Sequence, residues 1–417
     1  MKKFILFTTL ILANQLYAVE SYDCNFEGVN QTEIAIYPDQ ENSPTTKYRY
    51  QIVGKIDSEK PVVIYLPGGP GASSIDDFSN PIIRNASIRS GLPGSVPWIM
   101  IDPRTVGCNR GDEKVYPDDS LTSAYLAHDV LNVIEELKLQ KYILYGLSYG
   151  SQSATYVAGL AATRGLPQPH AIFLAGVMGR GEPDGSFSIP NQKIIEWELL
   201  KTQLSDKARA KLSEEKPLGI EPARWDRLIT KAVYEGYTLI DGKMRNYYLE
   251  LLQTLDQDDP KAQDKLREAL NPKPSNDPGT WDYSRRLFRE VDCHEYSPDD
   301  GGTLFSKGNL YFNQNDNPCE DEDFDRMFDS AEFEIKSHIY YLSGTNDPAA
   351  PYIGARYHFE NQHQSRRNFM SVKGAGHVGI RQILPDCKDK LWEAILNQND
   401  LLNVLPHCQA EVSLEIL

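Results

Sequence analysis

Short apolar segments, each about the length of one β-strand and each closed by a turn residue, recur along this sequence. They cover residues 62–66, 98–101, 142–145, 171–175, 338–342 and 368–372. Runs that are apolar almost throughout suit strands buried on both faces of a sheet, and such sheets are mostly parallel. The chain is therefore expected to fold around a central, mostly parallel sheet.

Helical patterns separate these strands. Residues 127–139 place apolar side chains on one face and Glu and Lys on the other, and residues 151–162 form a small-residue segment that can pack closely on a sheet. Strands that alternate with helices predict βαβ units and hence an α/β fold. Residues 48–53 alternate polar and apolar side chains, which predicts an antiparallel strand at the entrance of the sheet.

The middle of the chain has a different pattern. The apolar strand runs stop there, and charged amphipathic stretches such as 194–204 and 244–255 replace them. Because the strand pattern resumes afterwards, we expect a mainly helical cap that is inserted into a single core. The expected division is a leader at 1–18, a core at 19–182 and 331–417, and the cap at 183–330.

The first residues are typical of an export signal. Lys2 and Lys3 precede the apolar run 4–13, and Ala18 offers a small residue for cleavage, which together predict a secretory signal peptide over residues 1–18. The alternative is an N-terminal membrane anchor, but the run falls short of the ~20 apolar residues that a span needs. We therefore expect a secreted or periplasmic protein without a membrane span once the signal is removed.

The charge balance excludes one class of partner. The formal net charge is −16, and it becomes −18 when the two lysines Lys2 and Lys3 leave with the signal. Nucleic-acid binding needs a basic surface, so we expect no nucleic-acid partner. The acidity either favours cationic substrates through the long-range field or simply keeps an exported protein soluble.

Six cysteines in an exported chain predict disulfides. The closure of modest local loops favours the pairs Cys387–Cys408 and Cys293–Cys319, which leaves Cys24–Cys108. The spacing of these cysteines is not that of a zinc site, so we expect no bound metal.

The pentapeptide Gly146-Leu147-Ser148-Tyr149-Gly150 joins a predicted strand to a predicted helix. At such a sharp turn a serine is held in a strained backbone conformation with its oxygen exposed. Gly146 and Gly150 leave room for the tight crossing, where a side chain would clash. Ser148 is therefore the candidate nucleophile, and the alternative is a glycine-rich turn with an inert serine.

A glycine-rich loop, residues 67–71, follows the strand at 62–66. Its bare backbone can turn an N–H toward the carbonyl oxygen of a substrate. We expect the N–H groups of Gly69 and Tyr149 to form an oxyanion hole, although a simple tight turn is the alternative. No Gly-Lys-Ser/Thr follows, which excludes a phosphate-binding loop.

A base and an orienting acid complete the set. Asp347 lies just past one strand and His377 just past the last one, and the chain order Ser, Asp, His is the one expected of an α/β-hydrolase. His377 would take the proton from Ser148, and Asp347 would fix the tautomer of the imidazole. His338 opens a strand and is expected to be structural. The remaining candidates lie in polar contexts and are expected at the surface: His358, His363 and His407.

Together these motifs resemble the prolyl iminopeptidase and tripeptidyl aminopeptidase family of α/β-hydrolase-fold serine peptidases. The resemblance spans about residues 45–385, and the Gly-Gly-Pro-Gly loop is its most specific part. Its motifs lie at residues 66–71, 102–107 and 146–150 and in the loops of Asp347 and His377. The family often has His in place of Pro67 and Asp-Gln-Arg-Gly in place of residues 102–105. These departures concern the substrate class more than the catalytic machinery.

The resemblance implies that the protein releases amino acids or short peptides from a free N-terminus through an acyl-enzyme, with no metal or organic cofactor. In such enzymes carboxylates of the cap bind the α-ammonium of the substrate, because a buried cation must be paired. The candidates are Glu295 first, followed by Glu290, Glu196 and Glu198. Each of them could instead be an ordinary solvated carboxylate.

Two other functions stay open. A carboxylesterase that acts on small acyl esters would use the same triad, and the cap would then decide between esters and peptides. A non-catalytic binding module of the same fold usually lacks the serine or the histidine, and this chain has both Ser148 and His377.

Overall fold

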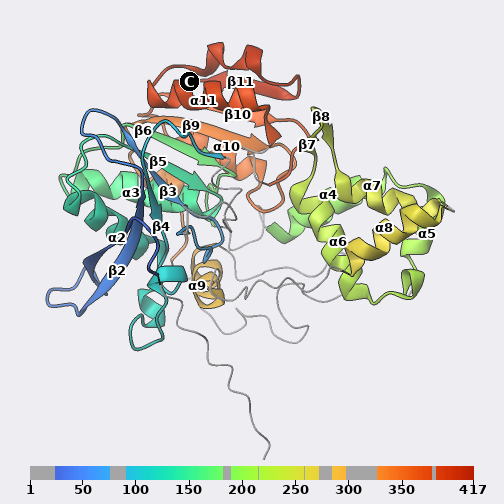
Figure 1. The fold of residues 1–417 in the computed structure, drawn as a ribbon, viewed down its shortest axis with the longest axis horizontal. Coiled ribbons are helices and arrows are strands. Elements are labelled where there is room, and N and C mark those ends of the chain that lie inside the picture. The colour runs from blue at the N-terminus through green and yellow to red at the C-terminus, as the bar shows by residue number, and fades with distance from the viewer. Residues whose placement is uncertain are drawn as a thin grey trace, which may run out of the picture.

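The computed structural model describes residues 24–75, 91–181, 189–214, 216–257, 259–271, 284–296, 326–377 and 382–417. A large β-sheet forms the centre of this part of the chain (Figure 1). Its strands are β1 (Val29–Ala35), β2 (Thr45–Val53), β3 (Val62–Leu66), β4 (Trp98–Ile101), β5 (Tyr142–Leu147), β6 (Ala171–Ala175), β9 (His338–Gly344), β10 (Arg367–Val372) and β11 (Val412–Ile416).

The order of the strands in the sheet is β1-β2-β4-β3-β5-β6-β9-β10-β11. The strands from β4 to β10 pair in parallel, whereas β2 is antiparallel to β4 and β1, and β11 is antiparallel to β10. Every apolar run picked out in the sequence is a strand, and the antiparallel entry strand is also confirmed. This is the mostly parallel sheet of the predicted α/β-hydrolase fold.

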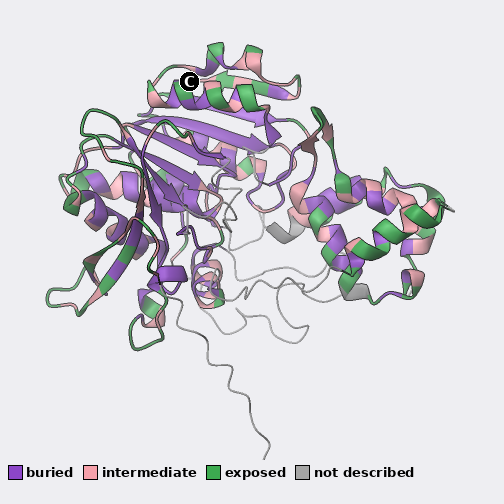
Figure 2. Ribbon diagram, in the orientation of Figure 1, coloured by how far each residue is buried: buried purple, intermediate pink, exposed green. Residues whose placement is uncertain are grey.

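Helices cover the two faces of the sheet. The helices α2 (Ser123–Glu136), α3 (Tyr149–Thr163) and α10 (Tyr352–Asn361) pack on one face, and α11 (Pro385–Leu396) packs on the other. Successive side chains of a strand alternate between the faces, so Ile64 joins the first core and Val63 joins the second. Because both faces are buried, as Figure 2 shows, β3 is apolar at every position.

The insertion between β6 and β9 is mainly helical and has a core of its own around Trp225, which is fully buried. Its helices are α4 (Ile189–Lys201), α5 (Asp206–Leu212), α6 (Pro222–Glu235), α7 (Tyr247–Gln253) and α8 (Pro260–Leu270), whereas α9 (Arg285–Val291) packs on the core of the main sheet through Leu287 and Val291. Besides these helices, β7 (Thr238–Ile240) and β8 (Lys243–Arg245) form a small antiparallel hairpin that the sequence pattern did not indicate. The stretch 244–255 therefore begins in a strand and not in a helix.

Short helical turns complete the described chain. Residues 292–296 continue α9 as a π-turn. The 3-10 turns lie at Gly107–Asn109, Asp118–Ser120, Pro217–Gly219, Thr254–Asp256, Ser330–Glu332, Leu401–Asn403 and Leu405–His407.

Two of the expected disulfides are confirmed. Cys24 is bonded to Cys108 and Cys387 to Cys408, with Cα–Cα distances of 5.6 Å and 4.7 Å. Cys319, the expected partner of Cys293, lies outside the described residues, and so does the predicted signal peptide at 1–18. Within the described part of the chain, every helix is too short or too polar to cross a bilayer.

One histidine differs from its expected place. His358 lies on α10 but is fully buried against α3, and its two ring nitrogens lie 2.9 Å from Tyr341 Oη and 2.9 Å from Thr155 Oγ1. Burial lowers the pKa of His358 to about 3, so the ring is neutral at physiological pH. The expectation of a surface position is wrong here, because two hydroxyl groups satisfy the ring inside the core.

Candidate active site

Ser148 lies at the turn between β5 and α3. Its backbone has φ 56° and ψ −125°, which is a strained conformation for a residue with a side chain. Two backbone bonds hold it there: Ser148 N donates to Ala175 O at 2.8 Å, and Ser148 O accepts from Ser151 N at 2.8 Å. The residue is only partly buried. The turn therefore presents the hydroxyl at the carboxyl ends of the parallel strands.

The two glycines of this turn are required by close backbone contacts. A Cβ on Gly146 would lie 2.3 Å from Gly150 O, and a Cβ on Gly150 would lie 2.0 Å from Leu66 O. Both distances are far shorter than a carbon can approach an oxygen. The turn can thus fold against β3 only with glycine at these two positions.

Asp347 and His377 meet beyond the ends of β9 and β10. His377 Nδ1 lies 2.8 Å from Asp347 Oδ2 and 3.0 Å from Oδ1, and both side chains are almost fully buried. Asp347 Oδ1 also accepts the backbone N–H groups of Ala349 and Ala350, at 2.9 Å and 2.8 Å. Because the carboxylate accepts the Nδ1 proton, Nε2 of His377 keeps its lone pair and can act as a base.

Gly176 connects the serine turn to the histidine. It follows Ala175, whose carbonyl accepts the N–H of Ser148. A Cβ on Gly176 would lie 2.9 Å from His377 Cε1 and 3.6 Å from Asp347 Oδ2. The imidazole therefore packs on the backbone beside Ser148, and all three predicted triad residues lie at one edge of the sheet.

The insertion also contacts the histidine loop. His377 N donates to Tyr234 O, near the end of α6, at 2.7 Å, and the two rings pack edge to face with centroids 4.9 Å apart. A Cβ on Gly376 would lie 2.5 Å from the same carbonyl oxygen. Tyr234 could not be found from the sequence, because a contact between a helix of the insertion and the last loop of the core leaves no local pattern.

The predicted oxyanion loop lies against the serine. A Cβ on Gly68 would lie 3.1 Å from Ser148 Cβ and 3.6 Å from its Oγ, so the peptide that joins Gly68 to Gly69 lies beside the nucleophile. Gly69 has φ 126°, which favours glycine. Tyr149 begins α3, and the first N–H groups of a helix have no acceptor within it.

Glu295, the first choice for binding an ammonium group, lies inside the core. It is 2% exposed. Its Oε1 accepts the N–H of Ser123 at 2.9 Å, and its Oε2 accepts from Gln152 Nε2. Burial raises the pKa of Glu295, although these hydrogen bonds lower it. The carboxylate thus joins the helices α2 and α3, and each of its oxygens already accepts a hydrogen bond inside the core.

The other three carboxylates lie in different surroundings. Glu290 is buried and pairs with Arg289 at 2.9 Å. Glu198 is exposed and pairs with Lys201 at 2.6 Å on the surface of α4. Glu196 is buried, and its Oε2 accepts from Asn346 Nδ2 at 2.7 Å, directly beside Asp347 in the chain. Of the four candidates, Glu196 is the one with a contact to the loop that carries Asp347.

No family model matches this chain, and no curated protein matches it either. Its structure is similar to an alpha/beta hydrolase fold protein from Chitinophaga pinensis (16% identity, 88% of this chain and 98% of the other, TM-score 0.44). It is also similar to an esterase from Rhodococcus sp. ECU1013 (14% identity, 88% and 98%, TM-score 0.44) and a bromoperoxidase from Bacillus anthracis (13% identity, 90% and 100%, TM-score 0.42).

Proposed function

We propose that this protein is a serine hydrolase in which Ser148, His377 and Asp347 form the catalytic triad. The observation that carries the proposal is the contact between His377 and Asp347, at 2.8 Å, at the same sheet edge as the strained turn of Ser148. That constellation is the one by which acyl-transfer triads are recognised on unrelated folds.

In the proposed reaction Ser148 Oγ attacks the carbonyl carbon of the substrate while His377 Nε2 takes its proton. Asp347 stabilises the imidazolium that forms. The N–H groups of Gly69 and Tyr149 bind the developing oxyanion. The imidazolium then protonates the leaving group, and water releases the acid from the acyl-enzyme by the same steps.

For the substrate we propose peptides with a free N-terminus, as the resemblance implies. Glu196 is the best placed carboxylate for the α-ammonium group, because it is buried and contacts Asn346. Its two oxygens accept from the neutral amides of Asn346 and Gln192, at 2.7 Å and 2.8 Å. A substrate ammonium would add the cation that a buried carboxylate needs.

Glu196→Gln is expected to lower kcat/KM for aminoacyl-naphthylamides by about 10-fold or more, which is the typical loss of one charged hydrogen bond. The same substrates with an acetylated amine should be hydrolysed equally by variant and wild type. Glu198→Gln is the matched control, because Glu198 lies two residues away on the exposed face of α4. An equal loss on both kinds of substrate would contradict amine binding by Glu196.

The second candidate function is a carboxylesterase with the same triad. Short acyl nitrophenyl esters, assayed beside the naphthylamides, separate the two functions. Turnover of the esters alone would rule out the peptidase. We also propose that the protein is exported, which its disulfides Cys24–Cys108 and Cys387–Cys408 favour.

Gly176→Ala is expected to lower kcat by about 100-fold, since displacement of a reacting group by about 1 Å can have an effect of that size. The new Cβ would lie 2.9 Å from the His377 ring, which must then move away from Ser148. Gly165→Ala is the matched control: Gly165 also has a positive φ, of 67°, but its Cβ would meet no atom within 4 Å. Equal kcat values in the two variants would contradict the placement of the imidazole.

A further inference from the structure

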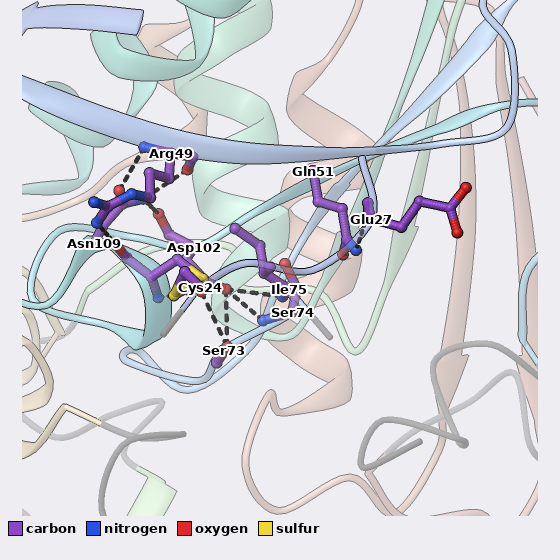
Figure 3. Close-up of a disulfide and its surroundings, with 10 residues drawn as sticks. Cys24, Glu27, Arg49, Gln51, Ser73, Ser74, Ile75, Asp102 and Asn109 are labelled. Atoms are coloured by element: carbon purple, nitrogen blue, oxygen red, sulfur yellow. Dashed lines mark hydrogen bonds between the residues drawn. A yellow bond between two sulfur atoms is a disulfide. The ribbon is translucent and has the colours of Figure 1, made fainter. Parts of the chain in front are cut away.

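Asp102 is a fully buried carboxylate at the end of β4. β4 pairs in parallel with β3, so the loops that follow the two strands leave the sheet side by side. The first loop contains Gly68 and Gly69, and the second contains Cys108. Figure 3 shows the side chain of Asp102 between these loops, close to the disulfide of Cys24.

The carboxylate of Asp102 accepts hydrogen bonds from both loops. Its Oδ1 accepts the backbone N–H groups of Ser74 and Ile75 at 2.6 Å and 3.0 Å, and the Ser73 hydroxyl also donates to it at 3.0 Å. Its Oδ2 accepts the N–H of Cys108 at 3.0 Å. Three successive residues of the loop after β3 are thus bound to one side chain.

The residue itself is held in place by its surroundings. Its carbonyl oxygen accepts from Tyr48 Oη at 2.8 Å and from Asn109 Nδ2 at 2.7 Å. A Cβ on Gly107 would lie 2.1 Å from Asp102 Oδ2. Glycine at position 107 thus lets the backbone of the second loop approach the carboxylate.

The bound residues lie a few positions beyond the predicted oxyanion donor. Two backbone hydrogen bonds also shape this loop. Ala72 N donates to Gly68 O at 3.3 Å, and Ser284 N, from outside the loop, donates to Gly71 O at 2.8 Å. Gly68 in turn lies against Ser148. The position of the Gly69 N–H relative to the serine therefore depends on where the loop is anchored at Asp102.

We propose that Asp102 is a positioning residue that holds the loop of residues 67–75 so that the Gly69 N–H points at the substrate oxyanion. The proposal rests on the function proposed above. A carboxylate is suited to the task because, when ionised, it is an acceptor only and can serve all four donors at once. Protonation would turn one acceptor into a donor and break at least one of these bonds.

This role predicts a dependence on pH. Burial raises the pKa of Asp102 to about 6, although the bonds from Ser74, Cys108 and Ser73 lower it. Charged and titratable side chains contact the same segments: Arg49 donates to Cys108 O at 2.9 Å, and Tyr48 donates to the carbonyl oxygen of Asp102. The ionised form dominates above about pH 6, so kcat should fall as the pH drops through that value.

Asp102→Asn tests the proposal on the intact enzyme with a short acyl nitrophenyl ester. The side-chain amide has one acceptor oxygen and one donor nitrogen, so it cannot accept hydrogen bonds from both loops as the two carboxylate oxygens do. We therefore expect kcat to fall by about 10- to 100-fold, less than for the loss of a whole oxyanion donor. KM should change by less than about threefold, because ground-state contacts are kept. A fluorophosphonate probe should still label Ser148 to completion.

Ser73→Ala is the milder variant, in case Asp102→Asn folds poorly. Without the hydroxyl donor, the pKa of Asp102 should rise further, so the acid limb of kcat should move to higher pH. Ile134→Val controls for a general loss of stability, because Ile134 is a buried residue of α2 and lies outside the loop of residues 67–75, and it should keep the wild-type kcat and pH profile.

The outcomes separate the two proposals. A wild-type kcat in Asp102→Asn, or an unmoved acid limb in Ser73→Ala, would overturn the positioning role while wild-type labelling at Ser148 still supports the hydrolase. Absence of labelling and turnover in the wild type would overturn the proposed function itself.

Discussion

Ser148→Ala is expected to lower kcat by about 10⁴- to 10⁶-fold, the range that follows from removal of the nucleophile of a triad. Alanine keeps the Cβ and so fits the backbone conformation of Ser148, with φ 56°. The fold should therefore be unchanged, and a loss of activity would be chemical and not structural. Initial rates on a nitrophenyl ester, together with the thermal midpoint of both proteins, measure the two effects separately.

The same variant gives a qualitative result as well. A fluorophosphonate probe should label the wild type with one equivalent and the alanine variant not at all. Asp347→Asn is the companion, since loss of the acid partner of His377, which lies 2.8 Å away, leaves the nucleophile in place. Rates within tenfold of wild type in Ser148→Ala would show that another group is the nucleophile.

Arg104→Met is expected to lower the free energy of unfolding by about 3–5 kcal/mol, because removal of one partner leaves a buried charge unpaired. Arg104 is 2% exposed, and its guanidinium binds both carboxylate oxygens of Asp129, each at 2.8 Å. It also donates to three backbone carbonyl oxygens, those of Ile36, Ser120 and Ala35. Urea unfolding followed by circular dichroism measures the loss.

The loss in Arg104→Met should grow with pH. Burial already raises the pKa of Asp129, although Arg104 lowers it, so the pKa must rise further when the guanidinium is gone. A carboxyl group whose pKa is higher in the folded state than in the unfolded state stabilises the fold at low pH. This stabilisation is lost as the pH rises through the folded-state pKa. The double variant Arg104→Met/Asp129→Leu should regain much of the stability, and an equal loss at pH 5 and pH 8 would contradict this account.

The sequence predicted the interior of the sheet well and its edges poorly. β3 and β6 are apolar at every position because both of their faces are covered, and such runs stand out in a sequence. β1 and β11 were not predicted, because most of their residues are exposed or half-buried and the strands lack a continuous apolar run. The short hairpin of β7 and β8 has too few residues to show any period.

Some residues of the candidate site could likewise be predicted from the sequence, and others could not. Ser148, Asp347 and His377 could be placed because each follows an apolar strand directly, and the ends of parallel strands meet at one edge. Glu295 could not be placed, since its burial depends on Ser123 and Gln152, which lie far away in the sequence.

The motif at residues 102–104 was visible, but its roles were not. Asp102 binds residues 73–75 and Arg104 binds Asp129, and these two sets of contacts lie on different elements of the core. Two charged residues that are close in the sequence thus bind unrelated partners. Only their partners, brought together by folding, distinguish a loop anchor from a buried ion pair.

The bond from His377 N to Tyr234 O has a consequence for how activity arises during folding. The imidazole sits where three separate stretches converge: the turn at Gly176, the acid loop at Asp347, and the end of α6. Under the proposed function, a folding chain acquires its base in working position only after the insertion has docked on the core. Hydrolysis of a simple ester would then report the docking of the insertion on the core.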